Sequence, residues 1–315
     1  MSRFRIVFFG TPAFAIPSLC ALLDGPDAVV GVVCQPDRPA GRGQRPHAPP
    51  VKEVALAHGL PVAQPDKLRS GDFPATFAGW NPDLAAVTAY GRILPPALLA
   101  QPRHGCINVH ASLLPKYRGA APIQWALLRG EETTGITIMQ MNERMDEGDI
   151  LLQRATRIAP GETFGELQER LATLGAAALM DALAELAAGT LQPRAQDHSA
   201  HTLAPPIKKE QGRIDWTRPA EEIARAVRAF NPWPTAYTTF NGRLLKIHRA
   251  HARQARAPRG VPGGVTTIGD AIEVACGEGS LAIEELQLEG RKRLRADEFT
   301  RGIEIAAGAR FGGAA

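Results

Sequence analysis

Three polar residues in this sequence could together stabilise and accept charge in an acyl transfer. Asn108 and His110 lie two residues apart in an apolar stretch that begins at Gly105, and alternate residues of a β-strand point to the same face. Asp146 follows the next apolar stretch, in a connection that also contains Gly148. An amide and an imidazole can donate hydrogen bonds to a developing oxyanion, while a nearby carboxylate favours the protonated ring and accepts a proton from an attacking amine. The three residues therefore predict acyl transfer without a covalent intermediate, provided that the two strands are neighbours.

A purely structural role is the simpler alternative for the same residues. Asn and His side chains on strands are often hydrogen-bonded parts of a core, and spacing alone does not distinguish the two roles. Several other chemistries lack their sequence motifs, because the chain has no GxxxxGK[ST] phosphate loop, no GxSxG nucleophile elbow and no HExxH zinc motif. Ser112 lies close to His110 but is not part of such an elbow.

The first 160 residues alternate between short apolar stretches rich in Val, Ile and Phe and helix-like stretches. This alternation is typical of a mostly parallel sheet covered by helices on both faces. Such sheets bind ligands beyond the carboxyl ends of their strands. Thr163 and Glu166 have the spacing of a capping box and predict the start of a long helix. We therefore expect an α/β domain with a mostly parallel sheet over residues 1–189, with the candidate residues near one strand end.

The composition changes after this helix. Residues 190–206 are polar and contain three prolines, which predicts a linker between domains. Residues 207–315 contain one amphipathic helix, followed by short β-like stretches that are separated by glycine-containing turns. This pattern predicts a second, smaller domain over these residues, built as a small antiparallel barrel or sandwich.

Basic charge is concentrated in the last third of the chain. Residues 1–206 contain 18 basic and 19 acidic residues, whereas residues 207–315 contain 18 and 13. An excess of this kind can bind a polyanion such as a nucleic acid, and it can equally serve solubility alone.

Cysteine usage and hydropathy predict the compartment. The four cysteines are far apart in the sequence and include no CxxC pair, so we expect neither a disulfide framework nor a zinc site. No uninterrupted apolar stretch reaches the roughly 18 residues that are needed to cross a bilayer. We therefore expect a cytoplasmic protein with no metal and no membrane partner, and we expect it to be a monomer.

Two segments resemble the paired signatures of the folate-dependent formyltransferases. The first is NVHASLLPKYRG, residues 108–119, and the second covers residues 135–148 and ends in MDEG. Both occur in the order and spacing of that family. In that family the positions of Asn108, His110 and Asp146 are catalytic and act on the formyl group of 10-formyltetrahydrofolate. The resemblance thus implies this co-substrate, and it favours a catalytic over a structural role.

Further segments resemble the branch of this family that formylates methionyl initiator tRNA. They are FFGTPAFAIPSL, PDRPAGRGQRPHAPPVK, AYGRILP and RIDWTRPAEEIARAVRAFNPWP, and with the two signatures they extend the likeness over nearly the whole chain. The implied activity is transfer of the formyl group from 10-formyltetrahydrofolate to the α-amine of methionyl initiator tRNA, which gives formylmethionyl-tRNA for translation initiation. The implied fold is a Rossmann-like catalytic domain with an OB-like carboxy-terminal domain that helps to hold tRNA.

The resemblance also implies which residues bind the two substrates. The folate site would be lined by one loop and by the backbone of a second loop, comprising Ser112, Leu113, Leu114, Pro115, Tyr90, Gly91, Ile93 and Leu94. Arg42 would approach the acceptor end of the tRNA, and Lys208 and Lys209 would lie near the tRNA. For each of these basic residues, a solvated surface charge is the alternative.

Some residues depart from the family pattern, and other functions stay open. The departures are Phe9, Ala13, Ala111 and the pair Gln44-Arg45, none of which is a candidate catalytic residue. One alternative is a formyltransferase that acts on another amine, such as a sugar nucleotide or glycinamide ribonucleotide. The other alternative is a non-catalytic folate- or RNA-binding module.

Overall fold

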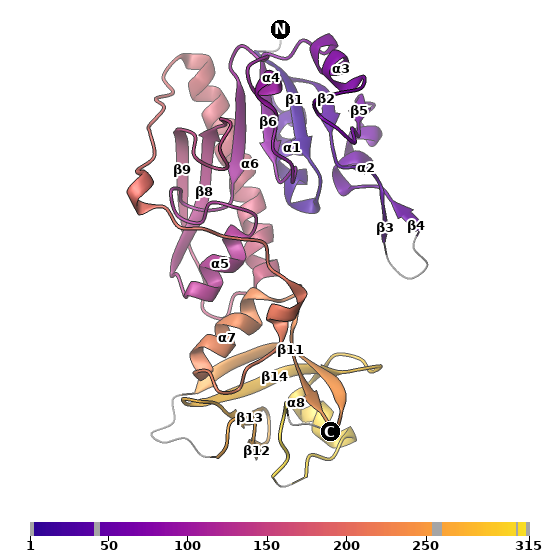
Figure 1. Cartoon of the computed structure of the whole chain (residues 1–315), viewed down its shortest axis with the longest axis vertical. Helices are drawn as coiled ribbons and strands as arrows, with labels where there is room; N and C mark the ends of the chain where they lie inside the picture. The colour runs from indigo at the N-terminus through magenta and orange to yellow at the C-terminus, as the bar shows by residue number, and fades with distance from the viewer. Residues whose placement is uncertain (1–2, 41–44, 254–259, 307, 313–315) are drawn as a thin grey trace. The chain divides into compact units, whose positions relative to one another are not determined.

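The computed structural model of the chain describes residues 3–40, 45–253, 260–306 and 308–312 (Figure 1). Its internal contacts divide the chain into two units, and each is described by itself. The first unit comprises residues 1–122, 133–157 and 168–205, and the second comprises residues 123–132, 158–167 and 206–315.

The first unit is built on a seven-stranded sheet with the strand order β5-β2-β1-β6-β7-β8-β9. Its strands are β1 (Arg5–Gly10), β2 (Ala28–Val33), β5 (Val62–Ala63), β6 (Leu84–Thr88), β7 (Cys106–His110), β8 (Thr133–Gln140) and β9 (Ile150–Arg157). The first five run parallel to one another, whereas β8 is antiparallel to both β7 and β9. The predicted mostly parallel, Rossmann-like sheet is therefore confirmed.

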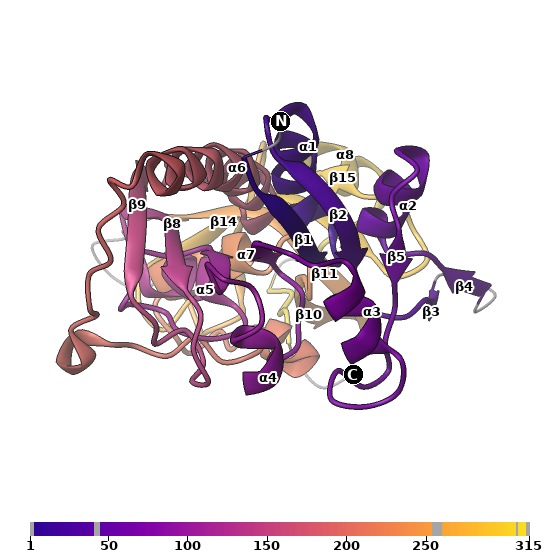
Figure 2. The same ribbon diagram turned by 90° about the horizontal axis from the view of Figure 1, so that it is seen from above.

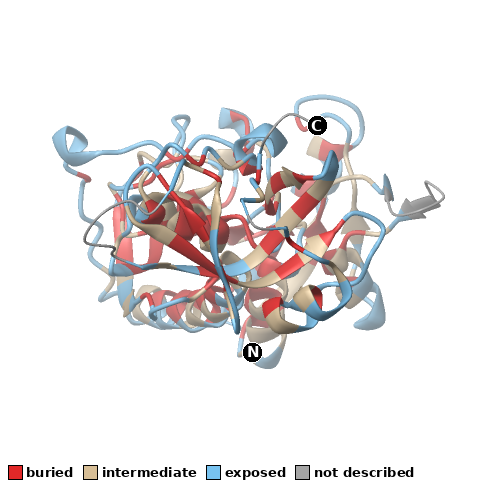
Figure 3. Cartoon of the chain, turned by 90° about the horizontal axis from the view of Figure 1, so that it is seen from below, coloured by how far each residue is buried: buried red, intermediate tan, exposed pale blue. Residues whose placement is uncertain are grey.

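Helices cover both faces of this sheet (Figure 2). They are α1 (Ile16–Asp24), α2 (Pro50–Ala57), α3 (Phe73–Gly79), α4 (Pro96–Leu99) and α6 (Phe164–Ala188), of which residues 168–188 belong to this unit. Helix α5 (Pro122–Arg129) belongs to the second unit apart from its first residue. The first unit also contains two 3-10 helices, η1 (Ala13–Ala15) and η2 (His198–Ala200), and a separate hairpin of β3 (Arg38–Ala40) and β4 (Arg45–His47). Buried residues follow the strands (Figure 3). A core cluster joins Phe9 and Val87 of the sheet to Phe77 of α3 and Leu98 of α4.

Helix α6 lies against the opposite face of the sheet. A Cβ atom on Gly175 would lie 2.8 Å from the side chain of Val109, so glycine allows the helix to approach β7 closely. The sequence predicted no membrane-spanning segment, because no uninterrupted apolar stretch is long enough. By length and composition alone, however, α6 could cross a membrane. Such evidence is weak, because core helices share these properties, and Leu171, Leu179 and Leu183 of α6 are completely buried.

The strand order determines where a ligand can bind. The chain proceeds outward from β1 through β2 to β5 on one side and from β6 through β7 on the other. In open sheets of this kind, ligands bind beyond the carboxyl ends of the strands at the point where the order reverses, which here lies between β1 and β6. Because β6 and β7 are parallel neighbours, the loops that follow Thr88 and His110 leave the sheet at the same edge.

Of residues 190–206, for which we expect a linker, residues 190–205 belong to the first unit and pair with other parts of it near both ends. Arg194 forms an antiparallel bridge with Ile150, and Leu203 forms a parallel bridge with Arg118. The Ala204 amide donates a hydrogen bond of 2.7 Å to the Arg118 carbonyl. The segment therefore contributes one side of the region around residues 117–119.

The second unit contains an antiparallel sheet with the order β10-β11-β14-β13-β12 and with β15 paired to β14. Its elements are η3 (Lys209–Gly212), α7 (Ala220–Ala229), β10 (Ala236–Phe240), β11 (Arg243–Arg253), β12 (Val265–Ile268), β13 (Ile272–Ala275), β14 (Ser280–Leu288), β15 (Leu294–Arg295) and α8 (Ala296–Gly302). Val227 of the amphipathic α7 packs with Leu245 and Ile283 of the sheet in one core. The separate antiparallel sheet and its helix are as predicted, while closure into an OB-like barrel stays a prediction.

The predicted capping box begins helix α6. Glu166 Oε2 accepts hydrogen bonds from Thr163 N at 2.8 Å and from Thr163 Oγ1 at 2.7 Å. The bond from the Thr163 backbone has the larger effect and the bond from its hydroxyl the next, and both lower the pKa of Glu166 below its ordinary value of 4.5. A carboxyl group whose pKa is lower in the folded than in the unfolded protein stabilises the fold when the pH is above its unfolded-state pKa. This stabilisation is lost as the pH falls through the folded-state pKa.

Thr163→Ala should lower the free energy of unfolding by about 1 kcal/mol, because the helix loses its cap. Urea denaturation at neutral pH measures this difference. The deficit relative to the wild type should shrink below pH 4.5, as Glu166 becomes protonated. Thr173→Ala is a suitable control, since Thr173 is exposed within the same helix and alanine is the better helix former there. Equal losses for the two variants would contradict a capping role.

Candidate active site

Strand β7 presents both Asn108 and His110 on one face of the sheet. In the strand register, Asn108 lies opposite Val87 of β6 and Met139 of β8, and His110 lies opposite Thr137. This is the face away from α6, because Val109, the residue between them, packs toward that helix. His110 is buried, whereas Asn108 is only partly buried.

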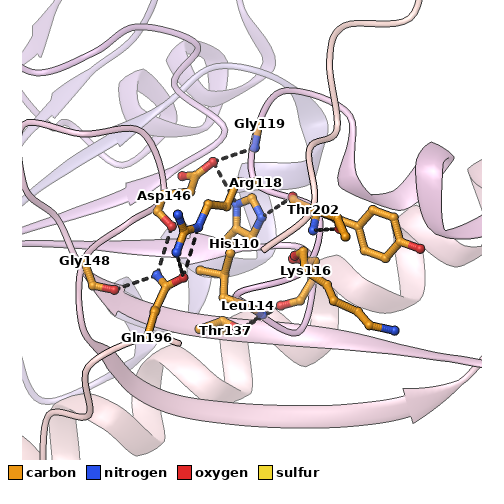
Figure 4. A network of polar contacts seen from close by, with 12 residues as sticks. His110, Leu114, Lys116, Arg118, Gly119, Thr137, Asp146, Gly148, Gln196 and Thr202 are labelled. Carbon is orange, nitrogen blue, oxygen red and sulfur yellow. Dashed lines mark hydrogen bonds and ion pairs between the residues drawn. The ribbon is translucent and has the colours of Figure 1, made fainter. Parts of the chain in front are cut away.

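The imidazole of His110 contacts a carbonyl oxygen at one nitrogen and faces a carboxylate at the other (Figure 4). Its Nε2 atom lies 3.0 Å from the carbonyl oxygen of Tyr117. Because a carbonyl only accepts hydrogen bonds, we assign the hydrogen of the neutral ring to Nε2. The Nδ1 atom lies 3.7 Å from Oδ2 of Asp146. The nitrogen that can gain or donate a proton toward a reacting group is therefore Nδ1.

Asp146 reaches His110 from a tight turn after β8. Its backbone has a φ of 56°, in the left-handed region that is uncommon for residues other than glycine. The Gly119 amide donates a hydrogen bond of 2.8 Å to Oδ2 of Asp146, the same oxygen that faces His110. A Cβ atom on Gly148 would lie 1.7 Å from the carbonyl oxygen of Gln140, so the turn requires glycine there. The structure thus brings His110 and Asp146 together, as their positions in the sequence suggested.

The side-chain amide of Asn108 is available to a ligand. Within the described parts of the chain, no residue forms a hydrogen bond with it. Asn108 is also partly exposed, on the same face of the sheet as His110. An amide donor and an imidazole nitrogen on one face, beside a carboxylate, are the groups that can stabilise an oxyanion and accept a proton.

The loop after β7 is held from beneath by Thr137. The hydroxyl of Thr137 donates to the carbonyl of Ser112 at 2.7 Å and accepts from the amide of Leu114 at 3.0 Å. The Ser112 hydroxyl donates to the carbonyl of Lys116 at 2.6 Å, which makes it part of the loop rather than a nucleophile. Ser112 and Leu114 are buried, so Leu113 and Pro115, which are partly exposed, are the members of this predicted folate-binding segment that can contact a ligand.

The loop after β6 is the second predicted folate-binding segment. Tyr90 and Leu94 are buried in the core, and burial raises the pKa of Tyr90 to about 12, so its phenol stays neutral. Gly91 and Ile93 are exposed, and the Ile93 side chain is 68% accessible. A pocket of about 550 Å³ lies beside this loop and is lined by residues that include Thr11, Gln35, Arg38, Tyr90, Gly91 and Arg92.

Three residues are predicted to bind tRNA, namely Arg42, Lys208 and Lys209. Arg42 lies outside the described residues. Lys208 and Lys209 belong to the second unit, where both are exposed at the start of η3. In the described part of the chain, no group of three or more His, Cys, Asp or Glu side chains is placed to hold a metal ion.

Sequence reasoning missed three residues that hold the site in place. Thr137 supports the loop after β7, as described above. Gln196 donates hydrogen bonds to the carbonyls of Asp146 and Gly148, and Arg118 donates to Gln196. These contacts join positions that are far apart in sequence, so no local motif indicates them. The NVHASLLPKYRG segment includes Arg118 without revealing its partner.

Thr137→Val should lower the free energy of unfolding by about 2 kcal/mol, because it removes the hydroxyl and leaves the Ser112 carbonyl and the Leu114 amide without this partner. Thermal or urea denaturation measures the loss. Thr134→Val provides the control, since Thr134 is also buried in β8 but has no side-chain hydrogen bond to the described residues. A deficit in Thr134→Val as large as that in Thr137→Val would refute the supporting role.

Comparison with known proteins identifies the family. The family model described as formyl transferase matches residues 4–183, and the model described as formyl transferase, C-terminal domain, matches residues 206–304. The methionyl-tRNA formyltransferase of Myxococcus xanthus is 52% identical over 98% of both chains. That of Geobacter metallireducens is 49% identical over 99% of this chain and 100% of its own.

Solved structures share the fold at low sequence identity. The N-formyltransferase from Helicobacter canadensis has a TM-score of 0.66 and 17% identity, with 93% of this chain and 100% of that chain covered. HypX from Aquifex aeolicus, solved with tetrahydrofolic acid, has a TM-score of 0.62 and 18% identity, and this chain spans 51% of its length. With two family models matched in order and relatives of about half identity over nearly the full length, the chain belongs to the formyl transferase family.

Proposed function

We propose that this protein transfers the formyl group of 10-formyltetrahydrofolate to the α-amine of methionyl initiator tRNA and thereby supplies formylmethionyl-tRNA for translation initiation. The observation that carries this proposal is the likeness to methionyl-tRNA formyltransferases over nearly the whole chain, including the second domain. The contact between His110 and Asp146, beside the free amide of Asn108, supplies the chemistry.

In the proposed reaction, the amine of the methionyl group attacks the formyl carbon. A carbon–nitrogen bond forms, and the formyl oxygen gains charge, which Asn108 and the protonated Nδ1 of His110 stabilise. Asp146 accepts the proton that the attacking amine loses, directly or through water. The tetrahedral intermediate then collapses, the bond to N10 of the folate breaks, and N10 takes up a proton. Nδ1 of His110 and Oδ2 of Asp146 are 3.7 Å apart, and catalytic contacts of this length commonly shorten when a substrate binds.

The two substrates would occupy different parts of the chain. We assign the folate to the loops of Ser112–Pro115 and Tyr90–Leu94, with Leu113, Pro115, Gly91 and Ile93 as the accessible contacts. We assign the tRNA to Arg42 and to the basic second domain, including Lys208 and Lys209. We further propose that the protein acts in the cytoplasm as a monomer, without a metal and apart from membranes.

The decisive experiment is to incubate the protein with 10-formyltetrahydrofolate and methionine-charged initiator or elongator tRNA, and to detect formylmethionine after deacylation. We expect formylation of the initiator tRNA. Asn108→Ala should lower kcat/KM by about 10²- to 10³-fold, because one preorganised oxyanion donor is lost. Retention of full turnover by this variant would exclude the role of Asn108, and absence of product from the wild type would exclude the proposed function.

The assignment of tRNA binding to basic residues predicts a strong dependence on salt. The logarithm of the affinity for tRNA should fall linearly with the logarithm of salt concentration, with a slope of roughly −0.7 to −0.9 for each neutralised phosphate. Filter binding or fluorescence titration measures the slope. Lys208→Ala should reduce the magnitude of this slope by the contribution of about one phosphate contact.

Arg42→Ala should weaken the use of tRNA more than the binding of folate. Equal damage to both substrates by Arg42→Ala would contradict the assignment.

A further inference from the structure

The side-chain amide of Gln196 lies under the turn that carries Asp146, although residues 190–206 have the composition of a linker (Figure 4). Gln196 is 5% exposed. Its Nε2 atom donates to the carbonyl of Asp146 at 2.9 Å and to the carbonyl of Gly148 at 2.7 Å. One side chain therefore binds both sides of this turn from a segment about 50 residues away in the sequence.

The other end of the same amide is bound by Arg118. Oε1 of Gln196 accepts hydrogen bonds from Nη2 of Arg118 at 2.7 Å and from its Nε at 3.2 Å. A carboxamide has two donor hydrogens and two acceptor lone pairs, and all four are used here. Carbonyls only accept and a guanidinium only donates, so the partners fix which end is oxygen and which is nitrogen. The amide therefore has one orientation that satisfies every partner.

The hydrogen bonds from Gln196 affect where the Asp146 carboxylate lies, because the backbone of Asp146 has an unusual conformation. Asp146 has a φ of 56°, and a residue other than glycine keeps such a conformation only where its surroundings impose it. Gln196 holds the main chain of the turn, while the Gly119 amide holds the carboxylate. Arg118 and Gly119 are consecutive, so the group that anchors Gln196 and the group that anchors the carboxylate belong to one loop.

We propose that Gln196 is a positioning residue for the formyl transfer: its amide, itself anchored by Arg118, keeps the Asp146 turn in the conformation that directs the carboxylate at His110. This inference rests on the proposed function for its kinetic readout only. Without the two donors of Gln196, the turn can relax toward an ordinary backbone conformation and carry Asp146 away from both His110 and Gly119.

Gln196→Glu tests the proposal with little change in shape. The variant keeps both acceptors for Arg118 but replaces the two donors that face the Asp146 and Gly148 carbonyls. Supporting residues behind a catalytic group commonly contribute about 10- to 100-fold, and we expect kcat to fall by that factor. The KM values for the folate and the tRNA should change by less than about threefold, because no substrate contact is removed.

Gln124→Glu is the matched control. Gln124 is also 5% exposed, and its Nε2 donates to the carbonyl of Trp233 within the second unit. We expect the control to keep the kcat of the wild type. If it lost as much kcat as Gln196→Glu, the effect would reflect a buried charge in general and the proposal would fail. Should Gln196→Glu not fold, Gln196→Met removes the same donors without a charge and is judged by the same criteria.

A double-mutant cycle with Asp146→Asn tests whether Gln196 acts through Asp146. In that background, Gln196→Glu should add less than about a twofold loss, because the residue that it positions has already lost its role. Losses that multiply fully would overturn the proposal.

Hydrogen exchange at the Gly119 amide provides a readout that needs no activity. This amide donates to the Asp146 carboxylate, so its exchange should accelerate by about tenfold or more in Gln196→Glu and stay unchanged in Gln124→Glu. Unchanged protection in Gln196→Glu would overturn the proposal. If the wild type formylates no methionyl-tRNA while Gly119 exchange accelerates as expected, the proposed function fails and the positioning role holds.

Discussion

The site depends on a loop that turns back onto the strand from which it came. The carbonyl of Tyr117 accepts the hydrogen bond from Nε2 of His110, and two residues later the Gly119 amide donates to the carboxylate of Asp146. Residues 110–119 thus fix both the ring and its acidic neighbour. Because the Tyr117 carbonyl occupies Nε2, only Nδ1 is left to exchange a proton with a reacting group.

The surrounding elements keep this loop from moving. Thr137 of β8 satisfies backbone groups of Ser112 and Leu114 beneath it. Residues 202–204 pair with its outer side through backbone hydrogen bonds to Arg118. A preorganised arrangement of this kind lowers the cost of stabilising charge at the moment it develops. The amide of Asn108 is partly exposed and has no hydrogen-bond partner among the described residues.

The sequence predicted the framework of the fold and the proximity of His110 to Asp146, but not the residues that support them. Alternating apolar stretches indicated the mostly parallel sheet, and the spacing of Thr163 and Glu166 indicated the start of α6, because both patterns are local. The pairing of His110 with Asp146 followed from two motifs on neighbouring strands. Gln196 gave no such indication, since its role arises from contacts with residues that are distant in the sequence, and its polar, proline-containing surroundings are typical of a linker.

The most direct test of this account is ¹⁵N NMR of the neutral His110 imidazole, assigned by comparison with a His110→Asn variant. Since Nε2 contacts the Tyr117 carbonyl, the account predicts that the neutral ring carries its hydrogen on Nε2 and none on Nδ1. A neutral ring with its hydrogen on Nδ1 and a bare Nε2 would contradict the assignment of Nδ1 as the reactive nitrogen, and with it the proposed arrangement of the site.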